Sequence, residues 1–150
     1  MSKALNDLII CFKSAGEMAS GIACSLYKAN FKNILMLETE CPLAVRRQVS
    51  FSEAVYNGTQ TVEEITAVKC QISENLQSIW DQSRIPVVVD PDWSILTQVK
   101  PDIVIDAILA KQNLGTRKEE ADLVIGLGPG FSAGHDVDIV IETNRGHNLG

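Results

Sequence analysis

The feature that most constrains this chain is the segment 8–40, in which two short apolar runs flank a glycine-containing turn and a helical pattern. Residues 8–12 are almost wholly apolar, as expected for a strand that is buried on both faces of a parallel sheet. A second apolar run, residues 34–37, follows the helical pattern. The segment therefore predicts a strand, a tight turn, a helix and a second strand, which is the first unit of an α/β fold.

The turn after the first strand matches part of the pattern G-x-G-x-x-[GA], which binds the pyrophosphate of a dinucleotide. Ser14, Gly16 and Ala19 occupy its three key positions, so only the middle glycine is kept. Glu38 follows Ser14 by 24 residues, near the spacing of roughly 20 expected for the acid that binds a ribose hydroxyl. We predict that this turn binds a nucleotide or cofactor; the alternative is a turn with a structural role only.

The rest of the chain continues the alternation of strands and helical segments. Apolar or β-favouring runs lie at residues 59–70, 85–89, 102–107, 123–125 and 138–142, and the first of these predicts an edge strand or a hairpin. Helical patterns lie at residues 50–56, 73–82, with Ser73 as the predicted cap, and 95–99. This order predicts a single domain over residues 1–150, with a doubly wound, mostly parallel sheet in three α/β/α layers.

Composition narrows the classes of partner. The 150 residues, of which 45% are hydrophobic and 21% charged, suffice for one domain with a sizeable core. The net charge of −6, with no block of lysine or arginine, argues against a nucleic-acid partner. No sequence window approaches a membrane span, and the N-terminus fits neither a secretion signal nor a transit peptide, so we predict a cytoplasmic protein without a membrane partner.

The four cysteines are scattered and lack the C-x-x-C spacing of metal sites. The two histidines lack the spacing of a zinc motif as well, so we predict no metal site. Cys41 differs from the other cysteines because it lies just beyond the second predicted strand, where ligand crevices of α/β proteins open. A reactive thiol there is an alternative to an ordinary surface residue.

A second glycine-rich segment follows the predicted strand at 123–125. Glycines at 126, 128, 130 and 134 can turn several amides inward and form a concave site for an anion, whereas a tight surface loop is the alternative. Charged or titratable side chains beyond neighbouring strands are expected at the same edge of the sheet. These side chains are Asp106, Lys111, Arg117, His135, Asp136, Glu142, Arg145 and His147. No spacing among them fixes a catalytic pair, so we assign no catalytic residue.

Four segments together carry a family resemblance: SAGEMASGIA, ETECPLAVRRQVSFSEAVYNG, KPDIVIDAILAKQNLGT and VIGLGPGFSAGHDVDIVIETNRGHNLG. They resemble the YqeB family of proteins associated with selenium-dependent molybdenum hydroxylases, which is itself similar to the Rossmann-like domain of the XdhC maturation factors. The resemblance spans nearly the whole chain. In the family the first segment looks like GAGDIATG, so Ser14 and Glu17 depart from that pattern.

The resemblance implies an accessory or maturation protein for a molybdenum hydroxylase, with a Rossmann-like domain that holds a nucleotide or molybdopterin cofactor. The implied partners are that hydroxylase or its other maturation factors, and a homodimer is compatible with the sequence. Family members look longer, so we expect this chain to be a fragment. The residues predicted to bind the cofactor, across both glycine segments, are Ser14, Gly16, Glu17, Met18, Ala19, Glu38, Arg46, Arg47, Gly126, Gly128, Gly130 and Arg145.

Two other functions stay open at this stage. One is an NAD(P)-dependent oxidoreductase, which needs a catalytic residue beside the nicotinamide that the sequence does not identify. The other is a module without a cofactor, in which both glycine segments only form turns or contact a partner.

Overall fold

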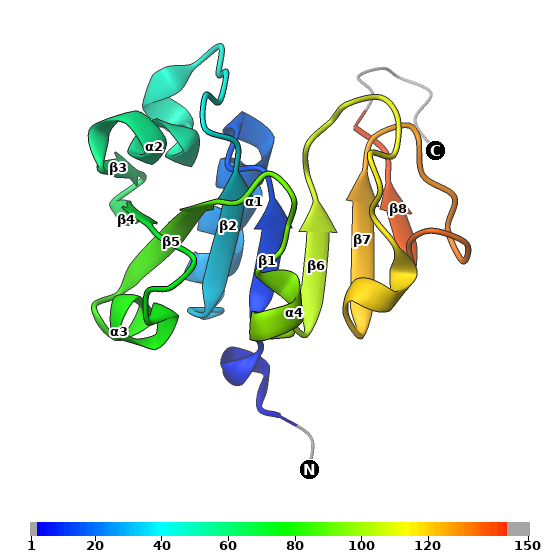
Figure 1. Cartoon of the computed structure of the whole chain (residues 1–150), viewed down its shortest axis with the longest axis horizontal. Coiled ribbons are helices and arrows are strands. Elements are labelled where there is room, and N and C mark those ends of the chain that lie inside the picture. The colour runs from blue at the N-terminus through cyan, green and yellow to red at the C-terminus, as the bar shows by residue number, and fades with distance from the viewer. Residues whose placement is uncertain (1–2, 144–150) are drawn as a thin grey trace.

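A computed structural model of the chain describes residues 3–143, which form one eight-stranded sheet with helices packed against it (Figure 1). The strand order is β3-β4-β5-β2-β1-β6-β7-β8, and every neighbouring pair is parallel except β3 and β4. The strands are β1 (Ile10–Lys13), β2 (Ile34–Glu38), β3 (Thr59–Val62), β4 (Ile65–Cys70), β5 (Arg84–Val89), β6 (Ile103–Asp106), β7 (Leu123–Leu127) and β8 (Ile139–Ile141). The predicted Rossmann-like, doubly wound and mostly parallel α/β fold is confirmed.

Four α-helices and four 3₁₀ turns connect the strands. The helices are α1 (Glu17–Lys28), α2 (Ala54–Asn57), α3 (Leu76–Asp81) and α4 (Leu96–Val99). The 3₁₀ turns are η1 (Leu5–Asp7), η2 (Arg47–Val49), η3 (Phe51–Glu53) and η4 (Lys118–Glu120). The cap of α3 differs from the prediction, because the side chain of Asn75, rather than that of Ser73, accepts a hydrogen bond from Gln77 N at 3.0 Å.

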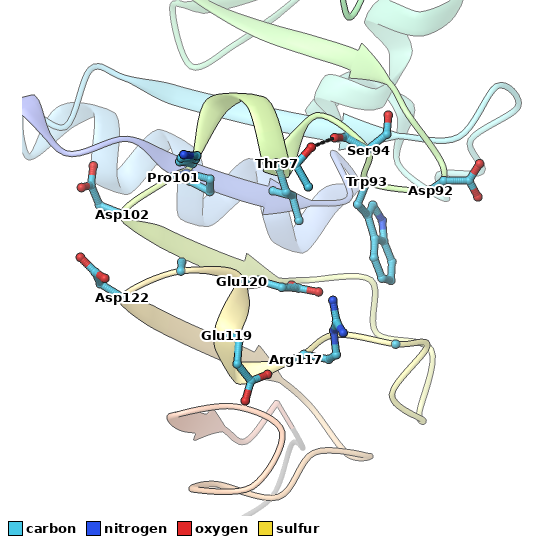
Figure 2. A pocket seen from close by; sticks show the side chains of 14 residues that line it. Asp92, Trp93, Ser94, Thr97, Pro101, Asp102, Arg117, Glu119, Glu120 and Asp122 are labelled. Carbon is cyan, nitrogen blue, oxygen red and sulfur yellow. Dashed lines mark hydrogen bonds between the residues drawn. The ribbon is translucent and has the colours of Figure 1, made fainter.

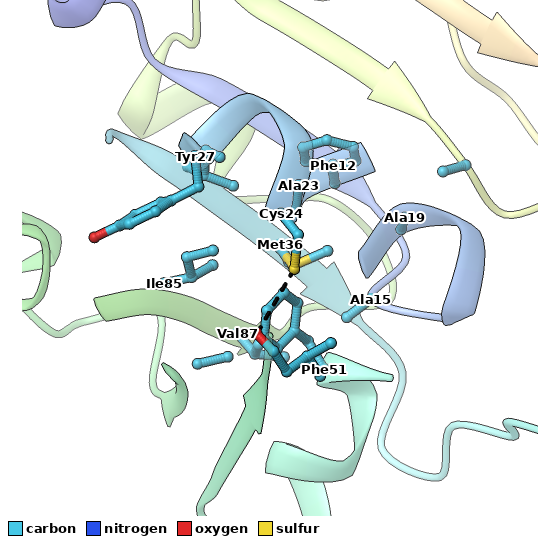
Figure 3. Close-up of a cluster of buried hydrophobic side chains, with 14 of the residues drawn as sticks. Phe12, Ala15, Ala19, Ala23, Cys24, Tyr27, Met36, Phe51, Ile85 and Val87 are labelled. Atoms are coloured by element: carbon cyan, nitrogen blue, oxygen red, sulfur yellow. Dashed lines mark hydrogen bonds between the residues drawn. The ribbon is translucent and has the colours of Figure 1, made fainter. Parts of the chain in front are cut away.

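The side chains of the central strands alternate between two apolar clusters, one on each face of the sheet. On the face of α1, Phe12 and Met36 pack with Ala19, Ala23 and Phe51 (Figure 3). On the opposite face, Cys11 and Leu37 pack with residues of α3 and α4, among them Trp80 and Leu96. Burial on both faces explains why the sequences of β1 and β2 are continuous apolar runs.

The sheet is not covered evenly. The connections that follow β6 and β7, residues 107–122 and 128–138, contain η4 but no α-helix. Leu109 and Lys111 adopt left-handed backbone angles, with φ of 59° and 63°, and Gly115 has a φ of 126°. Such angles interrupt a helix, so the first of these connections runs as a loop along the edge of the sheet.

The topology places a ligand crevice beside β1. The chain passes from β1 to β2 on one side and later returns to the other side of β1 as β6. In open α/β sheets ligands bind beyond the carboxyl ends of the strands at such a switch in direction. The loops after β1, β2, β5 and β6 therefore surround the candidate site.

Candidate functional site

A crevice of about 270 Å³ opens at the carboxyl ends of four adjacent strands. Ser14 contributes to it from the end of β1, Glu38 and Thr39 from the end of β2, and Trp93 from the segment after β5. Apolar side chains from two loops also line it, and they are Pro42, Leu43, Ile108 and Leu114. Leu37, Pro91 and the buried Asp90 complete the lining. The crevice is small for a ligand site, and it combines an aromatic wall with a few polar groups.

The turn between β1 and α1 keeps a left-handed residue where the dinucleotide pattern has its first glycine. Ser14 has a φ of 93°, a costly angle for a residue with a side chain. Its conformation is held by hydrogen bonds: Ser14 N donates to Leu37 O at 2.8 Å, and Gly16 N donates to Ser14 Oγ at 3.0 Å. The serine side chain thus satisfies an amide that a phosphate would otherwise bind.

Glu38 lies directly beside this turn, as predicted from its spacing. Ala15 N donates to Glu38 Oε1 at 3.1 Å, and Ser14 Oγ lies 3.5 Å from the same oxygen. Glu38 Oε2 accepts a hydrogen bond from Thr39 N at 2.7 Å. Thr39 Oγ1 also donates to Oε2 at 3.4 Å, so each carboxylate oxygen accepts two hydrogen bonds within the chain. The two hydroxyl bonds, from Ser14 Oγ and Thr39 Oγ1, are the longest of the four, and an O–H or N–H group of a ligand can replace them.

The first turn of α1 carries three further predicted residues. Ala19 is fully buried against the sheet, as the third position of the dinucleotide pattern requires, whereas Met18 is 41% exposed on the outer surface. Glu17 Oε1 accepts a hydrogen bond from Arg46 N at 2.6 Å and so anchors the loop after β2. Arg47 Nε lies 3.7 Å from Glu53 Oε1, with most of its side chain exposed. Arg46 and Arg47 are therefore exposed near the N-terminus of α1, and neither of them lines the crevice.

Lys13 and Trp93, which the sequence analysis did not identify, pack against each other beside the crevice, and Trp93 lines it. Lys13 ends β1 and is fully buried, and its Nζ lies 3.5 Å from the centre of the Trp93 ring. The same ammonium group forms an ion pair with Glu120 Oε2 at 2.6 Å and donates to Thr116 Oγ1 at 2.7 Å. Burial lowers the pKa of Lys13, and the hydrogen bond and charge of Glu120 only partly oppose this.

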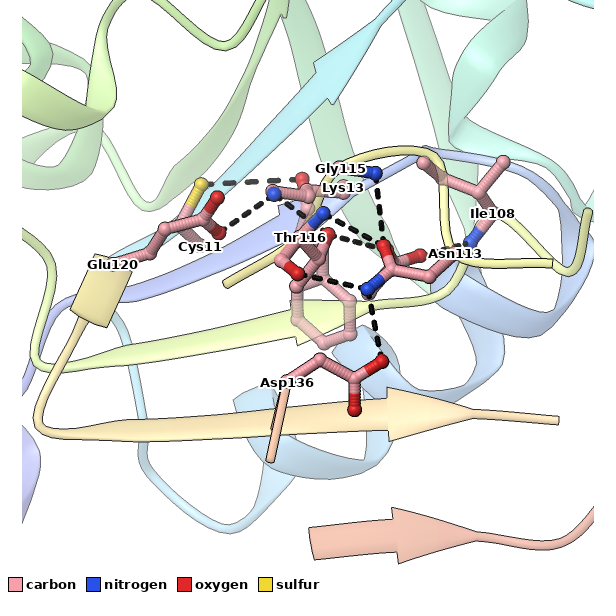
Figure 4. A network of polar contacts seen from close by, with 10 residues as sticks. Cys11, Lys13, Ile108, Asn113, Gly115, Thr116, Glu120 and Asp136 are labelled. Atoms are coloured by element: carbon pink, nitrogen blue, oxygen red, sulfur yellow. Dashed lines mark hydrogen bonds and ion pairs between the residues drawn. The ribbon is translucent and has the colours of Figure 1, made fainter. Parts of the chain in front are cut away.

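A chain of hydrogen bonds extends from Lys13 to the second glycine segment (Figure 4). Thr116 Oγ1 donates to the buried carboxylate of Asp106 at 2.6 Å. Asn113 Nδ2 donates to Thr116 O at 2.8 Å and to Asp136 Oδ2 at 3.1 Å. Asp106 and Asp136, which were expected among the side chains at the ligand edge of the sheet, thus hold the connecting loops together.

The glycines of the second segment are required by packing. A Cβ atom on Gly126 would lie 2.6 Å from the Phe131 ring, and one on Gly130 would lie 2.5 Å from Gln112 Cα. Gly128 and Gly130 also have φ of 81° and 107°. Gly128 N donates to Ile141 O at 2.9 Å, so this amide already has a partner. These contacts give the glycines a structural role, while the predicted anion site at this segment remains a prediction.

The two glycine segments line different cavities. The second cavity, of about 640 Å³, is lined by Gly128, Lys111 and Glu142 together with apolar side chains that include Phe131 and Val140. The loop after β6 separates it from the crevice, because Ile108 and Leu114 face the crevice whereas Leu109 and Lys111 face the second cavity. The structure therefore does not bring Gly16 and Gly128 together around one space, although both lie at the predicted edge of the sheet.

A third and larger cleft, of about 850 Å³, lies between the α4 segment and η4 (Figure 2). Its rim carries Asp92, Asp102, Glu119 and Asp122, and Arg117 contributes the guanidinium group. Trp93 lines both this cleft and the crevice. Arg117 thus lies away from the predicted site, in a cleft whose acidic rim is unfavourable for an anion.

The remaining predicted residues are dispersed or undescribed. His135 is exposed in the loop after β7, and its N donates to Ser132 O at 3.1 Å. Cys41 is exposed, whereas Cys11, Cys24 and Cys70 are buried, and burial raises the pKa of the Cys70 thiol to about 12. Arg145 and His147 lie outside the described residues.

Neither a metal site nor a membrane span is found in the described part of the chain. Among residues 3–143, no three His, Cys, Asp or Glu side chains are grouped so as to hold a metal ion. Over the same residues, each helix is too short or too polar to cross a bilayer.

Comparison with known proteins gives one similarity over nearly the whole chain. The chain is 50% identical over 142 residues to "Uncharacterized protein YqeB" of Escherichia coli (strain K12), and the match covers 95% of this chain and 26% of YqeB. The chain thus spans about a quarter of the length of this relative. No family model matches the chain, and no solved structure matches it. The similarity supports the resemblance to the YqeB family, and the links to molybdenum, selenium and XdhC remain predictions.

Proposed function

We propose that this chain, which is similar to YqeB over nearly its whole length, is the cofactor-binding part of an accessory protein for a selenium-dependent molybdenum hydroxylase. The role in that enzyme system rests on the family resemblance. The binding site is the crevice beyond β1, β2, β5 and β6, and its ligand is molybdopterin or a nucleotide-like cofactor.

The observation that carries this proposal is the convergence of four strand ends on one crevice that has an aromatic wall. Trp93 is only partly buried, and its backbone has a φ of 57°. An unfavourable backbone angle that places an aromatic ring at a ligand crevice is a feature of functional sites. A planar heteroaromatic ring, such as a pterin or a base, can pack against Trp93, Ile108 and Leu114.

Polar groups at the crevice orient that ring or its sugar. The carboxylate of Glu38 is held in place by Ala15 N and Thr39 N, and it accepts an N–H group of a pterin or an O–H group of a ribose. Because Glu38 is fixed by backbone amides, its position does not depend on the ligand. This preorganisation favours binding at a low entropic cost.

The anionic part of the cofactor lies at the start of α1 in this proposal. The first amides of an α-helix lack intrahelical partners, and the helix dipole favours an anion there. Arg46 and Arg47 are exposed close by and supply positive charge, which the chain as a whole does not, because its net charge is −6. Glu17 opposes an anion at the same place, so the arginines are needed to balance it.

A thermal-shift panel tests the proposal. The probes are purified molybdopterin, NAD, NADH, NADP, ATP, CTP and GTP, each added to this chain and to full-length Escherichia coli YqeB. A ligand at about 100 times its dissociation constant adds roughly 2.7 kcal/mol of stability. We expect a shift with molybdopterin or with one nucleotide, and no oxidation of NADH.

Variants locate the ligand. Trp93→Ala should remove the thermal shift. Trp80→Phe changes the second tryptophan of the chain, which lies in α3 away from the crevice, and it should leave the thermal shift in place. A shift confined to nicotinamide nucleotides together with turnover of NADH would replace the proposal with an oxidoreductase. The absence of a shift for all probes in both proteins would overturn it.

A further inference from the structure

The strand registers place a row of branched aliphatic side chains on the α1 face of β6, β7 and β8. Ile10 and Phe12 of β1 belong to the apolar cluster under α1, and they are in register with Ile103 and Ile105 of β6. The same register continues outward through Leu123, Ile125 and Leu127 of β7 to Ile139 and Ile141 of β8. Residues in register point to the same face, so this row is an extension of the core surface under α1.

This row is exposed only at its outer edge. Ile105 and Leu127 are 5% and 3% exposed, and Ile103, Leu123 and Ile125 are partly buried, whereas Ile139 and Ile141 of β8 are 44% and 48% exposed. The opposite face of the same strands is covered, because Val104, Val124 and Val137 there are buried. In Figure 1, α1 lies behind β1 and β2, and no helix of residues 3–143 lies behind β6, β7 and β8. Among the residues that the structure describes, no helix covers the α1 face of β6, β7 and β8.

Helix α1 forms a wall beside this uncovered face. Ser20 and Cys24 lie on its flank toward η3 and β3, since Phe51 N donates to Ser20 Oγ at 2.8 Å and Cys24 Sγ lies 3.8 Å from Val62 O. At about 100° per residue, Ile22 and Leu26 lie on the opposite flank. Both are partly buried against the same core cluster as Ile103 and Ile125. A shallow hollow of about 280 Å³, lined only by residues of α1, lies beside them on the helix surface.

We call the resulting surface the bare trough. Its floor is the partly buried side chains of Ile103, Leu123 and Ile125 together with the exposed Ile139 and Ile141, and its wall is the flank of α1 that carries Ile22 and Leu26. The residues that form it are Met18, Ile22, Leu26, Ile103, Leu123, Ile125, Ile139 and Ile141.

We infer that an amphipathic helix with a branched aliphatic stripe, belonging to the further polypeptide of a longer YqeB-type protein, packs into the bare trough. The width fits one helix: three strands about 4.8 Å apart span roughly 10 Å, and a helix with side chains is about 10–12 Å across. Mostly parallel sheets carry helices on both faces. The matched segment is 26% of YqeB, so the relative has enough additional chain to supply this helix.

A second copy of this chain fits the trough less well. Helix α1 projects from the same face, so a second sheet cannot lie flat against β6, β7 and β8. The helix α1 of a second copy would have to enter instead, and its exposed residues include Gly21, Ser25 and Lys28. These residues offer little apolar surface to match five branched side chains.

Cysteine labelling tests the inference. Ile139→Cys is made in a Cys41→Ser background of this chain, and the reaction with N-ethylmaleimide is followed by mass spectrometry of the labelled peptide. Val45→Cys is the matched control, because Val45 is exposed to 95% and lies in the loop after β2. Both thiols should react rapidly in this chain. A second variant, Ile141→Cys, repeats the test on the same face.

The same substitutions are then made at the aligned positions of full-length YqeB. The thiol aligned with Ile139 should react at least about tenfold more slowly than in this chain, because labelling then requires local opening of the packed helix. The thiol aligned with Val45 should keep its rate. Equal rates for the Ile139 position in both proteins would overturn the inference. Slow labelling in this chain itself, which becomes fast on dilution, would identify a second copy as the occupant and would also overturn it.

Discussion

The two glycine segments look alike in sequence and differ in what their glycines do. In the turn after β1, Gly16 has an ordinary φ of −68°, and a Cβ atom there would meet only Ser14 Oγ at 3.3 Å. In the second segment, which begins within β7, a Cβ atom on Gly126 or Gly130 would lie within 2.6 Å of other atoms. The first segment is thus conformationally tolerant and borders the crevice, whereas the second is fixed by its neighbours.

This difference shows what a run of glycines can and cannot indicate. Glycine allows backbone amides to approach a ligand, but it equally allows an aromatic ring or another loop to approach the backbone. Phe131 and Gln112 take the space around the second segment, and Ile141 O takes the amide of Gly128. The first segment has fewer glycines, and the crevice beside it, although smaller than the second cavity, is lined by the Glu38 carboxylate and the Trp93 ring.

The largest expected effect is that of Gly130→Ala. The added Cβ atom would lie 2.5 Å from Gln112 Cα, and the φ of 107° is unfavourable for alanine. We expect a loss of about 3 kcal/mol or more in the free energy of unfolding, measured by urea denaturation. A loss below about 1 kcal/mol would show that the two loops can move apart, and it would break the contrast between the segments.

Gly126→Ala should have the next largest effect, because the added methyl group displaces the Phe131 ring. We expect a loss of about 2 kcal/mol from the overpacked contact. Combining Gly126→Ala with Phe131→Leu should restore part of the loss relative to the sum of the single changes, which a double-mutant cycle measures. Strict additivity would contradict direct packing between these residues.

Asp136→Asn tests the hydrogen bonds that fix the second segment. Asp136 accepts hydrogen bonds from Ser132 N at 2.6 Å and from Asn113 Nδ2 at 3.1 Å. Although desolvation raises the pKa of Asp136, these bonds outweigh it, and the pKa is lowered from its ordinary value of 3.8. We expect the substitution to cost about 1 kcal/mol at neutral pH.

The pH dependence of that cost follows from the direction of the shift. A lowered pKa in the folded state means that the stabilisation is complete above pH 3.8 and is lost as the pH falls through the folded-state value. The difference in unfolding free energy between the original chain and Asp136→Asn should therefore shrink below about pH 4. A difference that stays constant down to pH 2 would contradict this role.

Gly16→Ser should have the smallest effect on stability. Gly16 is the N-cap of α1, serine is at least as favourable as glycine at this position, and its φ of −68° suits either residue. We expect a change within about 0.5 kcal/mol, measured in the same urea experiment. A loss as large as that of Gly130→Ala would remove the difference between the two segments.

Most of the fold could be predicted because burial on both faces of a parallel sheet produces continuous apolar runs. The position of Glu38 beside the turn also followed from spacing alone. The helix cap at Asn75 was missed because Ser73 and Asn75 are both good caps, and only the packing of Leu76, Ile79 and Trp80 selects the start of the helix.

The contact between Lys13 and Trp93 beside the crevice could not be predicted from the sequence. Lys13 follows an apolar run at the carboxyl end of a strand, which is the same signal that drew attention to Asp106, but a lone lysine there is normally solvated. Its partners, Trp93, Thr116 and Glu120, come from distant segments. The role of Gly130 likewise depends on Gln112, which no local pattern connects to it.

The most direct test measures ligand affinity and stability together in two variants, Gly16→Arg and Gly128→Ala, with molybdopterin, NAD and ATP as probes. Gly16→Arg places a bulky side chain at the start of α1, next to the crevice, and should abolish binding while the unfolding free energy changes little. Gly128→Ala strains a φ of 81° and crowds Thr143 and Leu109, so it should lower stability and leave affinity unchanged. The reverse result, in which Gly128→Ala abolishes binding and Gly16→Arg does not, would contradict the assignment of the crevice as the cofactor site.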